Sequence, residues 1–350
     1  MKEITIKDIA KICGVGVSTV SRAINNHPDI NPETKKKVVD TIKKYDYVPN
    51  NSARNLKRTE ANTIAVLVKV ITNPFFNTMI KVIGQYIKSK KYTMVLHHVE
   101  YNEDEVDVAI ELVKEKRLRG IIFLGGYFMH AENKLNKIQV PFVLSTVSCP
   151  PENISRKNYS SIAVDDKKES YKITKFLLEL GHRDIAILTA DTNSASIGSL
   201  RLEGYLEALK EYNIPVKQEL IRTMREDMET YSMQNGYIVT KELLESKIHF
   251  TAIFAISDMI AIGACKAITD TGKNVPDDYS VVGFDGIEMT SYYYPSITTI
   301  EQPVADMALS TSKLLFDIIE KKKQHTHIIY EAKLKEGNST KALIMKKNKA

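Results

Sequence analysis

Cysteine and tryptophan are scarce in this sequence of 350 residues, which has three cysteines and no tryptophan. Cys13, Cys149 and Cys265 lie far apart, so they form neither a C-x-x-C metal motif nor a disulfide framework. Widely spaced single thiols are typical of proteins that stay in the reducing cytosol. The cysteine usage therefore favours a cytoplasmic protein.

Long apolar runs are missing as well. No run approaches the roughly 18 residues that a membrane-spanning helix needs. The N-terminal segment MKEITIKDIA also lacks the apolar core of a signal peptide. We expect no membrane partner and a cytoplasmic location.

Motifs for catalysis and metal binding are absent from the sequence too. It contains no G-x-x-x-x-G-K-[ST], no G-x-S-x-G and no H-E-x-x-H. The histidines of His97-His98 and His325-Thr326-His327 lack the partners that a zinc site requires. We therefore expect no enzyme activity, no cofactor and no metal.

The positive charge is concentrated at one end of the chain. Residues 1–60 hold 12 Lys and Arg against 7 Asp and Glu, a net charge of +5, whereas the other 290 residues hold 37 against 36. The length exceeds one compact core, since a domain typically takes about 100–200 residues. The distribution predicts a small basic head that binds a polyanion and a nearly neutral body.

The head has the pattern of a helix-turn-helix. Thr5-Ile6-Lys7-Asp8 matches a T-x-x-D capping box, which predicts a helix that begins near Ile6. Gly14 and Gly16 bracket a tight turn before a second predicted helix at 17–25. Asn31 and Pro32 then cap and begin a third helix. Such a module binds DNA or, in the alternative interpretation, another protein.

The second helix predicts two faces with different tasks. Val20, Ala23 and Ile24 share an inward face. The outward face suits a major groove, because Arg22 can form paired bonds with guanine, Ser18 can bond several bases, and Val17 can contact a thymine methyl beside Thr19. Three further side chains suit phosphates, which fix the register without reading sequence: Thr5, Ser21 and Asn25.

After residue 60, apolar runs alternate with amphipathic stretches in two similar series. The runs predict buried strands and the stretches predict helices, which gives an α/β body of two doubly wound parallel-sheet subdomains. A ligand of such a fold lies at the carboxyl ends of the strands, here in the cleft between the halves. The predicted strands include TIAVLVKV, GIIFLGG, DIAILTA, TAIFAIS and YSVVGFDG.

Two sets of segments resemble the LacI/GalR family of bacterial transcriptional regulators. TIKDIAKICGVGVSTVSRAIN, INPETKKKVVDTIKKYDYVPN and SARNLKR are similar to its DNA-binding head and hinge. ITNPFFNTMI, LELGHRDIAIL, RLEGYLEAL, SDMIAIGACKAI, VPDDYSVVGFDG and PSITTIEQP are similar to successive parts of its effector domain. That domain has the fold of periplasmic sugar-binding proteins, so the resemblance covers nearly the whole chain.

The resemblance also implies an order of domains. It predicts an all-α helix-turn-helix head at 1–49 and a hinge helix or linker at 50–60. A periplasmic-binding-protein-like body follows in two subdomains. The first comprises 61–160 and about 293–325, and the second comprises 161–292 and about 326–345.

In this family the hinge folds into a short helix on DNA, as a pair from two subunits, and a leucine enters a base step of the minor groove. Leu56 stands at the matching position. An apolar wedge of this kind unstacks a step at a cost of a few kcal/mol and bends the duplex, while cations neutralise phosphates. The hinge residues implied for minor-groove binding are Asn50, Ala53, Arg54, Leu56 and Lys57.

The resemblance implies effector residues as well. Arg201 matches an arginine that anchors the effector, and Asp285 matches a carboxylate that accepts ligand hydroxyls. Phe76 and Tyr231 are candidates for an aromatic wall, and Gln302 for a polar lining residue.

Three positions depart from the family pattern. Ser257 and Thr146 stand where the family often has an asparagine and an aspartate, and Gly286 stands where it tends to have an acid or amide. Ser257 and Thr146 remain candidates for the effector site. Each departure removes a hydrogen-bonding group, so the ligand does not follow from the best-known members.

The resemblance implies a homodimeric repressor of carbohydrate genes that binds double-stranded operator DNA. Its effector would be a small molecule, a sugar or sugar phosphate. A phosphorylated carrier protein acting as corepressor, a purine corepressor, and a cytosolic sugar sensor or enzyme remain the alternatives.

Overall fold

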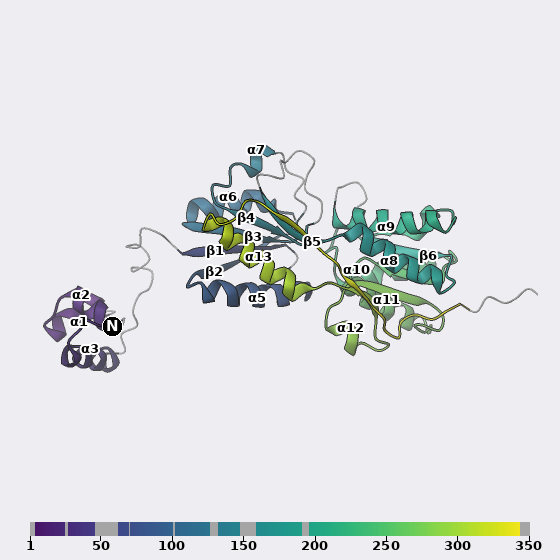
Figure 1. Ribbon diagram of the computed structural model, residues 1–350. Coiled ribbons are helices and arrows are strands. Elements are labelled where there is room, and N and C mark those ends of the chain that lie inside the picture. The colour runs from purple at the N-terminus through teal and green to yellow at the C-terminus, as the bar shows by residue number, and fades with distance from the viewer. Residues whose placement is uncertain are drawn as a thin grey trace, which may run out of the picture. The chain divides into compact units, whose positions relative to one another are not determined.

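The computed structural model describes residues 4–24, 27–45, 62–69, 71–100, 102–126, 132–147, 159–190 and 196–343. The chain divides into two compact units, Met1–Ala61 and Asn62–Ala350. The first unit is the head and the second is the body (Figure 1). The predicted class, an all-α head followed by an α/β body, is confirmed.

The head consists of three helices whose ends are capped as the sequence predicts. Asp8 accepts a hydrogen bond from the Thr5 backbone N–H at 2.9 Å, and Gly14 ends the first helix with φ 66°. The Asn31 side chain accepts from the backbone N–H groups of the third helix at 2.9 and 3.2 Å. The helices are α1 (Ile6–Cys13), α2 (Val17–Ile24) and α3 (Pro32–Lys44).

A small apolar cluster holds these helices together. Val20 and Ala23 of α2 are buried, and they belong to one cluster with Ile9 of α1 and Val38 of α3. Ile24 packs against this cluster from the end of α2. The inward face predicted for the second helix is thus confirmed, which leaves its opposite face toward solvent.

The first sheet of the body has six parallel strands in the order β11-β5-β4-β3-β1-β2. Its strands are β1 (Thr63–Lys69), β2 (Thr93–Val99), β3 (Leu118–Leu124), β4 (Phe142–Ser145), β5 (Ser160–Val164) and β11 (His327–Tyr330). The helices of this subdomain are α5 (Phe75–Ser89), α6 (Glu105–Glu115), α7 (Glu132–Leu135) and α13 (Val304–Ile319).

Both faces of this sheet are covered, because alternate side chains of its strands enter different clusters. Ala65 and Leu67 of β1 pack in one cluster with residues of α6. Ile64 and Val66 pack on the other side, in the cluster that includes residues of α5 and α13. These two helices lie side by side in Figure 1.

The second sheet has the order β12-β10-β9-β8-β6-β7, with β12 antiparallel and the other strands parallel. Its strands are β6 (Ile185–Thr189), β7 (Ile221–Thr223), β8 (Ala252–Ala255), β9 (Ser280–Asp285), β10 (Thr298–Glu301) and β12 (Lys333–Lys335). Its helices are α8 (Asp166–Glu179), α9 (Ile197–Glu211), the 3-10 helix η1 (Gln218–Leu220), α10 (Met233–Glu245), α11 (Asp258–Asp270) and α12 (Met289–Tyr292).

The chain crosses between the two sheets three times, a few residues later than predicted. It leaves the first sheet after Val164, returns after Glu301 and leaves again after Tyr330. The resemblance predicts these crossings near residues 160, 293 and 325. The pairing of β11 with β5, in which His327 lies opposite Ser161, joins segments far apart in sequence, and local pattern does not show such a partner.

Two helix pairs on the second sheet approach so closely that only glycine fits at the contact. A Cβ atom on Gly204 of α9 would lie 2.1 Å from the carbonyl oxygen of Lys167 in α8. A Cβ atom on Gly263 of α11 would lie 2.0 Å from the carbonyl oxygen of Met233 in α10. These backbone contacts fix the helices that carry part of the site.

We expect Gly263→Ala to lower the free energy of unfolding of the body by roughly 1–3 kcal/mol, because the added methyl group displaces backbone rather than a flexible side chain. Gly84→Ala is the matched control. Its Cβ would meet only the end of the Met94 side chain, at 3.3 Å, in the middle of α5. Thermal unfolding followed by circular dichroism should show a lower midpoint for Gly263→Ala than for the parent protein, and no decrease for Gly84→Ala. Equal midpoints would contradict the packing argument.

Candidate functional site

The outward face of α2, which is predicted to contact bases in the major groove and is called the reading face below, lies toward solvent. Val17, Ser18 and Arg22 are exposed, whereas Thr19 and Ser21 are half-buried. They lie on α2 opposite the buried Val20 and Ala23 that anchor it. The helix therefore offers a short row of polar and apolar groups on a rigid support.

The Thr5 side chain is exposed at the start of α1, and its hydroxyl donates to Asp8 at 2.7 Å. Other predicted contacts lie outside the described residues. These are Asn25 in the head and, in the hinge, Asn50, Ala53, Arg54, Leu56 and Lys57.

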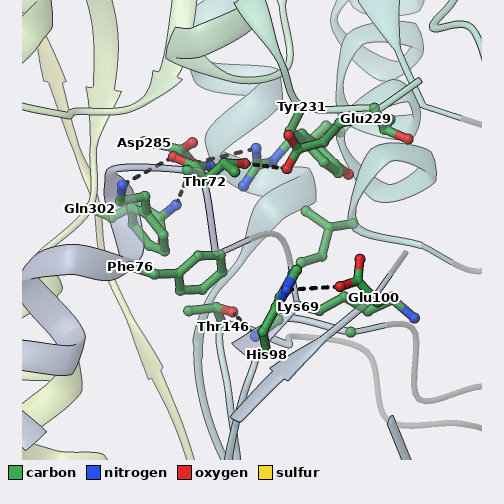
Figure 2. A pocket seen from close by; sticks show the side chains of 17 residues that line it. Lys69, Thr72, Phe76, His98, Glu100, Thr146, Glu229, Tyr231, Asp285 and Gln302 are labelled. Atoms are coloured by element: carbon green, nitrogen blue, oxygen red, sulfur yellow. Dashed lines mark hydrogen bonds and ion pairs between the residues drawn. The ribbon is translucent and has the colours of Figure 1, made fainter. Parts of the chain in front are cut away.

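The body contains a cavity of about 390 Å³ between its two sheets. It lies where the strands of each sheet end, as the doubly wound fold predicts. Asp285 and Gln302 lie toward one end, and Lys69, His98 and Glu100 lie toward the other (Figure 2). Six of the seven predicted effector residues line it: Phe76, Thr146, Arg201, Tyr231, Asp285 and Gln302.

Arg201 is buried at the wall of this cavity, with 5% of its surface exposed. Its Nε donates to Asp166 at 2.9 Å, and its Nη2 lies 2.8 Å from the same carboxylate. Nη1 donates to the Ile256 carbonyl and lies 3.6 Å from Asp285. The guanidinium carbon is 3.6 Å from the ring centre of Phe284. Burial lowers the pKa of Arg201, but the charges of Asp166 and Asp285 outweigh this and raise it.

Asp285 ends β9 with φ 121°, a backbone conformation that costs energy for any residue but glycine. Its carboxylate accepts from the Gln302 amide at 3.1 Å and bonds the Asn73 side chain. Burial raises the pKa of Asp285 to about 6, although the charge of Arg201 lowers it. A strained, buried carboxylate that is not saturated by donors suits a ligand rich in hydroxyl groups.

Asp258 holds this strained turn in place, and sequence reasoning missed it. Its carboxylate accepts from the backbone N–H groups of Gly286 and Ile287 at 2.7 and 2.8 Å, and from the Thr299 hydroxyl at 2.6 Å. Burial and the nearby charge of Asp285 raise the pKa of Asp258 well above its usual range. Gly283 leaves room for this carboxylate, since a Cβ there would lie 2.2 Å from it, but this closeness shows only in the structure.

Ser257 does not belong with the other predicted effector residues. It is fully buried, and its hydroxyl accepts from the Ile260 backbone N–H at 3.3 Å as the cap of α11. In the part of the chain that the structure describes, it is not among the residues that line the cavity. A short hydroxyl that faces its own helix start cannot reach where a longer amide would.

Thr146 does line the cavity and is itself strained. It has φ 70°, an unusual value for a β-branched residue. Its hydroxyl accepts from the Gly125 backbone N–H at 3.2 Å, and its own N–H donates to the Ile162 carbonyl at 2.7 Å. These bonds join the ends of three neighbouring strands.

Several cavity residues were not predicted. Lys69 ends β1, and its Nζ donates to the Glu103 carbonyl at 2.8 Å and lies 3.2 Å from Glu105. The Thr72 hydroxyl, in the first subdomain, donates to the Glu229 carboxylate in the second. Lys69 could have been predicted to line the cavity, because it stands at the end of a buried strand. The bond between Thr72 and Glu229 could not, because the two residues are too distant in sequence.

Among the described residues, no group of three or more His, Cys, Asp or Glu side chains is arranged to hold a metal ion. The helices that the structure describes include none long and apolar enough to cross a membrane.

Comparisons with known proteins point to one family. Residues 5–50 match the bacterial regulatory proteins of the lacI family, and residues 174–340 match a periplasmic binding protein-like domain. The HTH-type transcriptional regulator MalR of Clostridium butyricum is 43% identical, over 95% of this chain and 98% of that protein. Catabolite control protein A of Priestia megaterium is 29% identical, over 93% and 96%.

Solved structures show the same fold. The lac repressor dimer bound to operator and the anti-inducer ONPF has a TM-score of 0.75 and 24% identity, and covers 97% of this chain and 100% of its own. The transcriptional regulator CelR in complex with cellobiose has a TM-score of 0.69 and 25% identity, over 96% and 100%.

The raised pKa of Asp285 predicts a pH-dependent cost to stability. An unfolded aspartate titrates near pH 4, so folding favours the protonated form, and this stabilisation is lost as the pH rises from about 4 through 6. Asp285→Asn cannot ionise and should melt higher than the parent at pH 7.5, by several degrees. At pH 4.5 the difference should shrink.

Thermal unfolding of the ligand-free protein at the two pH values measures this difference. Glu336→Gln, at an exposed carboxylate after β12, is the control and should show the same small change at both. If the melting temperatures of Asp285→Asn and the parent differed by the same amount at both pH values, the assigned titration of Asp285 would be contradicted.

Proposed function

Because the chain belongs to the LacI family and is a DNA-binding transcription regulator, we propose that it represses carbohydrate uptake or catabolism genes under control of a small-molecule effector. The observation that carries this proposal is the cavity between the two sheets. It combines aromatic side chains, Phe76 and Tyr231, with the carboxylate of Asp285. Rings of this kind pack on sugar faces, and carboxylates accept from hydroxyls. The cellobiose complex of CelR, a structural relative, supports a sugar.

DNA recognition would use the exposed face of α2. Arg22, Ser18 and Val17 would contact base edges in the major groove, while Thr5, Ser21 and Asn25 would contact phosphates. The chain would act as a homodimer in the cytoplasm, so that two heads bind the halves of a pseudo-palindromic operator. The relative solved as a dimer on its operator supports this arrangement.

The hinge would couple the two functions. Leu56 would enter a minor-groove step at the operator centre, flanked by Asn50, Ala53, Arg54 and Lys57. Effector binding would favour one relative arrangement of the two body subdomains, and this would change how the paired hinges sit on DNA.

We expect fluorescence anisotropy to detect tight binding to DNA from upstream of the protein's own gene. A panel of sugars, sugar phosphates and purines should contain a ligand that changes this affinity. If no ligand does so while specific binding persists, a phosphorylated carrier protein becomes the better candidate for the signal. Equal affinity for random DNA would contradict sequence-specific regulation.

Two variants test the reading face in the same assay. Arg22→Ala should weaken operator binding by about 1–3 kcal/mol and relax base preference, since it removes a base contact. Lys57→Ala, the matched loss of one positive charge, should weaken operator and random DNA alike. Parallel losses on both DNAs for both variants would remove Arg22 from base recognition.

Leu56→Ala should reduce operator bending while the fold and the thermal midpoint stay unchanged. The wedge bends the duplex by unstacking one step, and alanine is too small to do so. A circular-permutation gel assay measures the bend angle. The same bend in both proteins would return Leu56 to the status of a linker residue.

A further inference from the structure

We propose that the effector is an uncharged saccharide, and that the cavity rejects phosphorylated sugars, sugar acids and nucleotides. This inference rests on the proposed function, because it concerns the ligand of the same cavity. It follows from the ion pairs and hydrogen bonds that the charged lining residues already form within the protein.

Of the lining residues that the structure describes, two carry a fixed positive charge, Lys69 and Arg201. An anionic ligand would need at least one of them as its partner. Lys69 is 6% exposed and bonds the Glu103 carbonyl and the carboxylate of Glu105, which is itself 3% exposed. Its charge is therefore neutralised inside the protein.

Arg201 is neutralised in the same way. Nε and Nη2 of the guanidinium both contact the Asp166 carboxylate. The third nitrogen, Nη1, donates to the Ile256 carbonyl and lies 3.6 Å from Asp285. A phosphate that paired with this group would compete with the buried carboxylates for it, and a displaced carboxylate would lose its cationic partner in the interior. Arg201 thus serves to orient Asp285 rather than to attract an anion.

The charge that faces the ligand is negative. Glu100, Glu229 and Asp285 line the cavity, so carboxylates outnumber the cations there even before Glu105 and Asp166 are considered. A second anion in such a site is repelled, and the low dielectric of a closed cleft strengthens the repulsion. Ionised carboxylates only accept hydrogen bonds, so the ligand must donate them, as hydroxyl groups do.

Some backbone donors at the helix starts near the cavity are used within the protein as well. A free helix N-terminus binds phosphate readily. At α5, however, the Phe75 N–H donates to the Asn73 side chain at 3.0 Å. At α9, the Ser199 N–H donates to the Ser196 hydroxyl at 3.2 Å. At each of these two helix starts in the described lining, one backbone N–H is thus already bonded to a side chain of the protein.

The remaining lining suits hydroxyl groups and carbon–hydrogen faces. Gln302, Thr146 and Thr72 provide neutral polar groups, and Phe76 and Tyr231 provide aromatic surface. An uncharged saccharide can donate to the carboxylates and lie against the rings without a counter-charge.

Isothermal titration of the full chain, without DNA, tests this with matched pairs. The pairs are cellobiose and its 6′-phosphate, maltose and its 6′-phosphate, glucose with glucose 6-phosphate and glucuronate, and ribose with ribose 5-phosphate. We expect at least one neutral sugar to bind, and its charged counterpart to bind at least tenfold more weakly. Tighter binding of any charged partner would overturn the proposal but leave a sugar-controlled regulator intact. Failure of every neutral sugar to bind would overturn it too.

A variant tests the physical cause. Glu105→Gln removes the buried partner of Lys69, so the ratio of phosphorylated to neutral affinity should rise about tenfold. Glu229→Gln removes a negative charge from a half-buried lining position and should raise the same affinity ratio at least threefold. It provides the test if Glu105→Gln unfolds. Unchanged ratios in both folded variants would refute the charge argument. Operator binding measured in parallel reports separately on the proposed function.

Discussion

The geometry of the cleft depends on one buried carboxylate, Asp258. It accepts three hydrogen bonds, two from the turn after β9 and one from β10, and so joins the start of α11 to both strands. These bonds help to hold Asp285 at φ 121°, together with the bonds that its own carboxylate and carbonyl accept from Gln302. The energy of that unfavourable conformation is supplied by the surrounding fold, which is how strained residues persist at binding sites. The position of the Asp285 carboxylate therefore depends in part on Asp258, which is not among the described residues that line the cavity.

In the cavity lining that the structure describes, each of the two buried cations, Arg201 and Lys69, has its own carboxylate. Asp166 holds Arg201 from the start of α8, and Glu105 holds Lys69 from the start of α6. The Lys69–Glu105 pair joins the end of β1 to the start of α6, and the Arg201–Asp166 pair joins α9 to the start of α8, so the ion pairs also fix these elements relative to one another. Pairing of this kind lowers the cost of burying the charges but leaves little attraction for an outside anion. The same bonds thus contribute to both architecture and selectivity.

Features set by local chemistry were predictable from the sequence. The caps of α1 and α3 follow from the side chains of Asp8 and Asn31, and the buried strands follow from their apolar runs. Arg201 and Asp285 were placed at the cleft by resemblance. Ser257, expected there by the same resemblance, lies outside the described lining, because its short side chain bonds the start of its own helix. The crossings were expected only approximately, near residues 160, 293 and 325, and the Thr72–Glu229 bond was beyond prediction because its residues lie 157 positions apart in the sequence.

The three crossings have a mechanical consequence. Two rigid bodies joined by one strand can twist and translate freely, but three short connections, after Val164, Glu301 and Tyr330, leave mainly a bending motion about a common line. Under the proposed function, effectors of different shape would then differ in how far they bend the body but hardly in the direction. Effector binding would be expressed mainly as a change in one angle between the two subdomains.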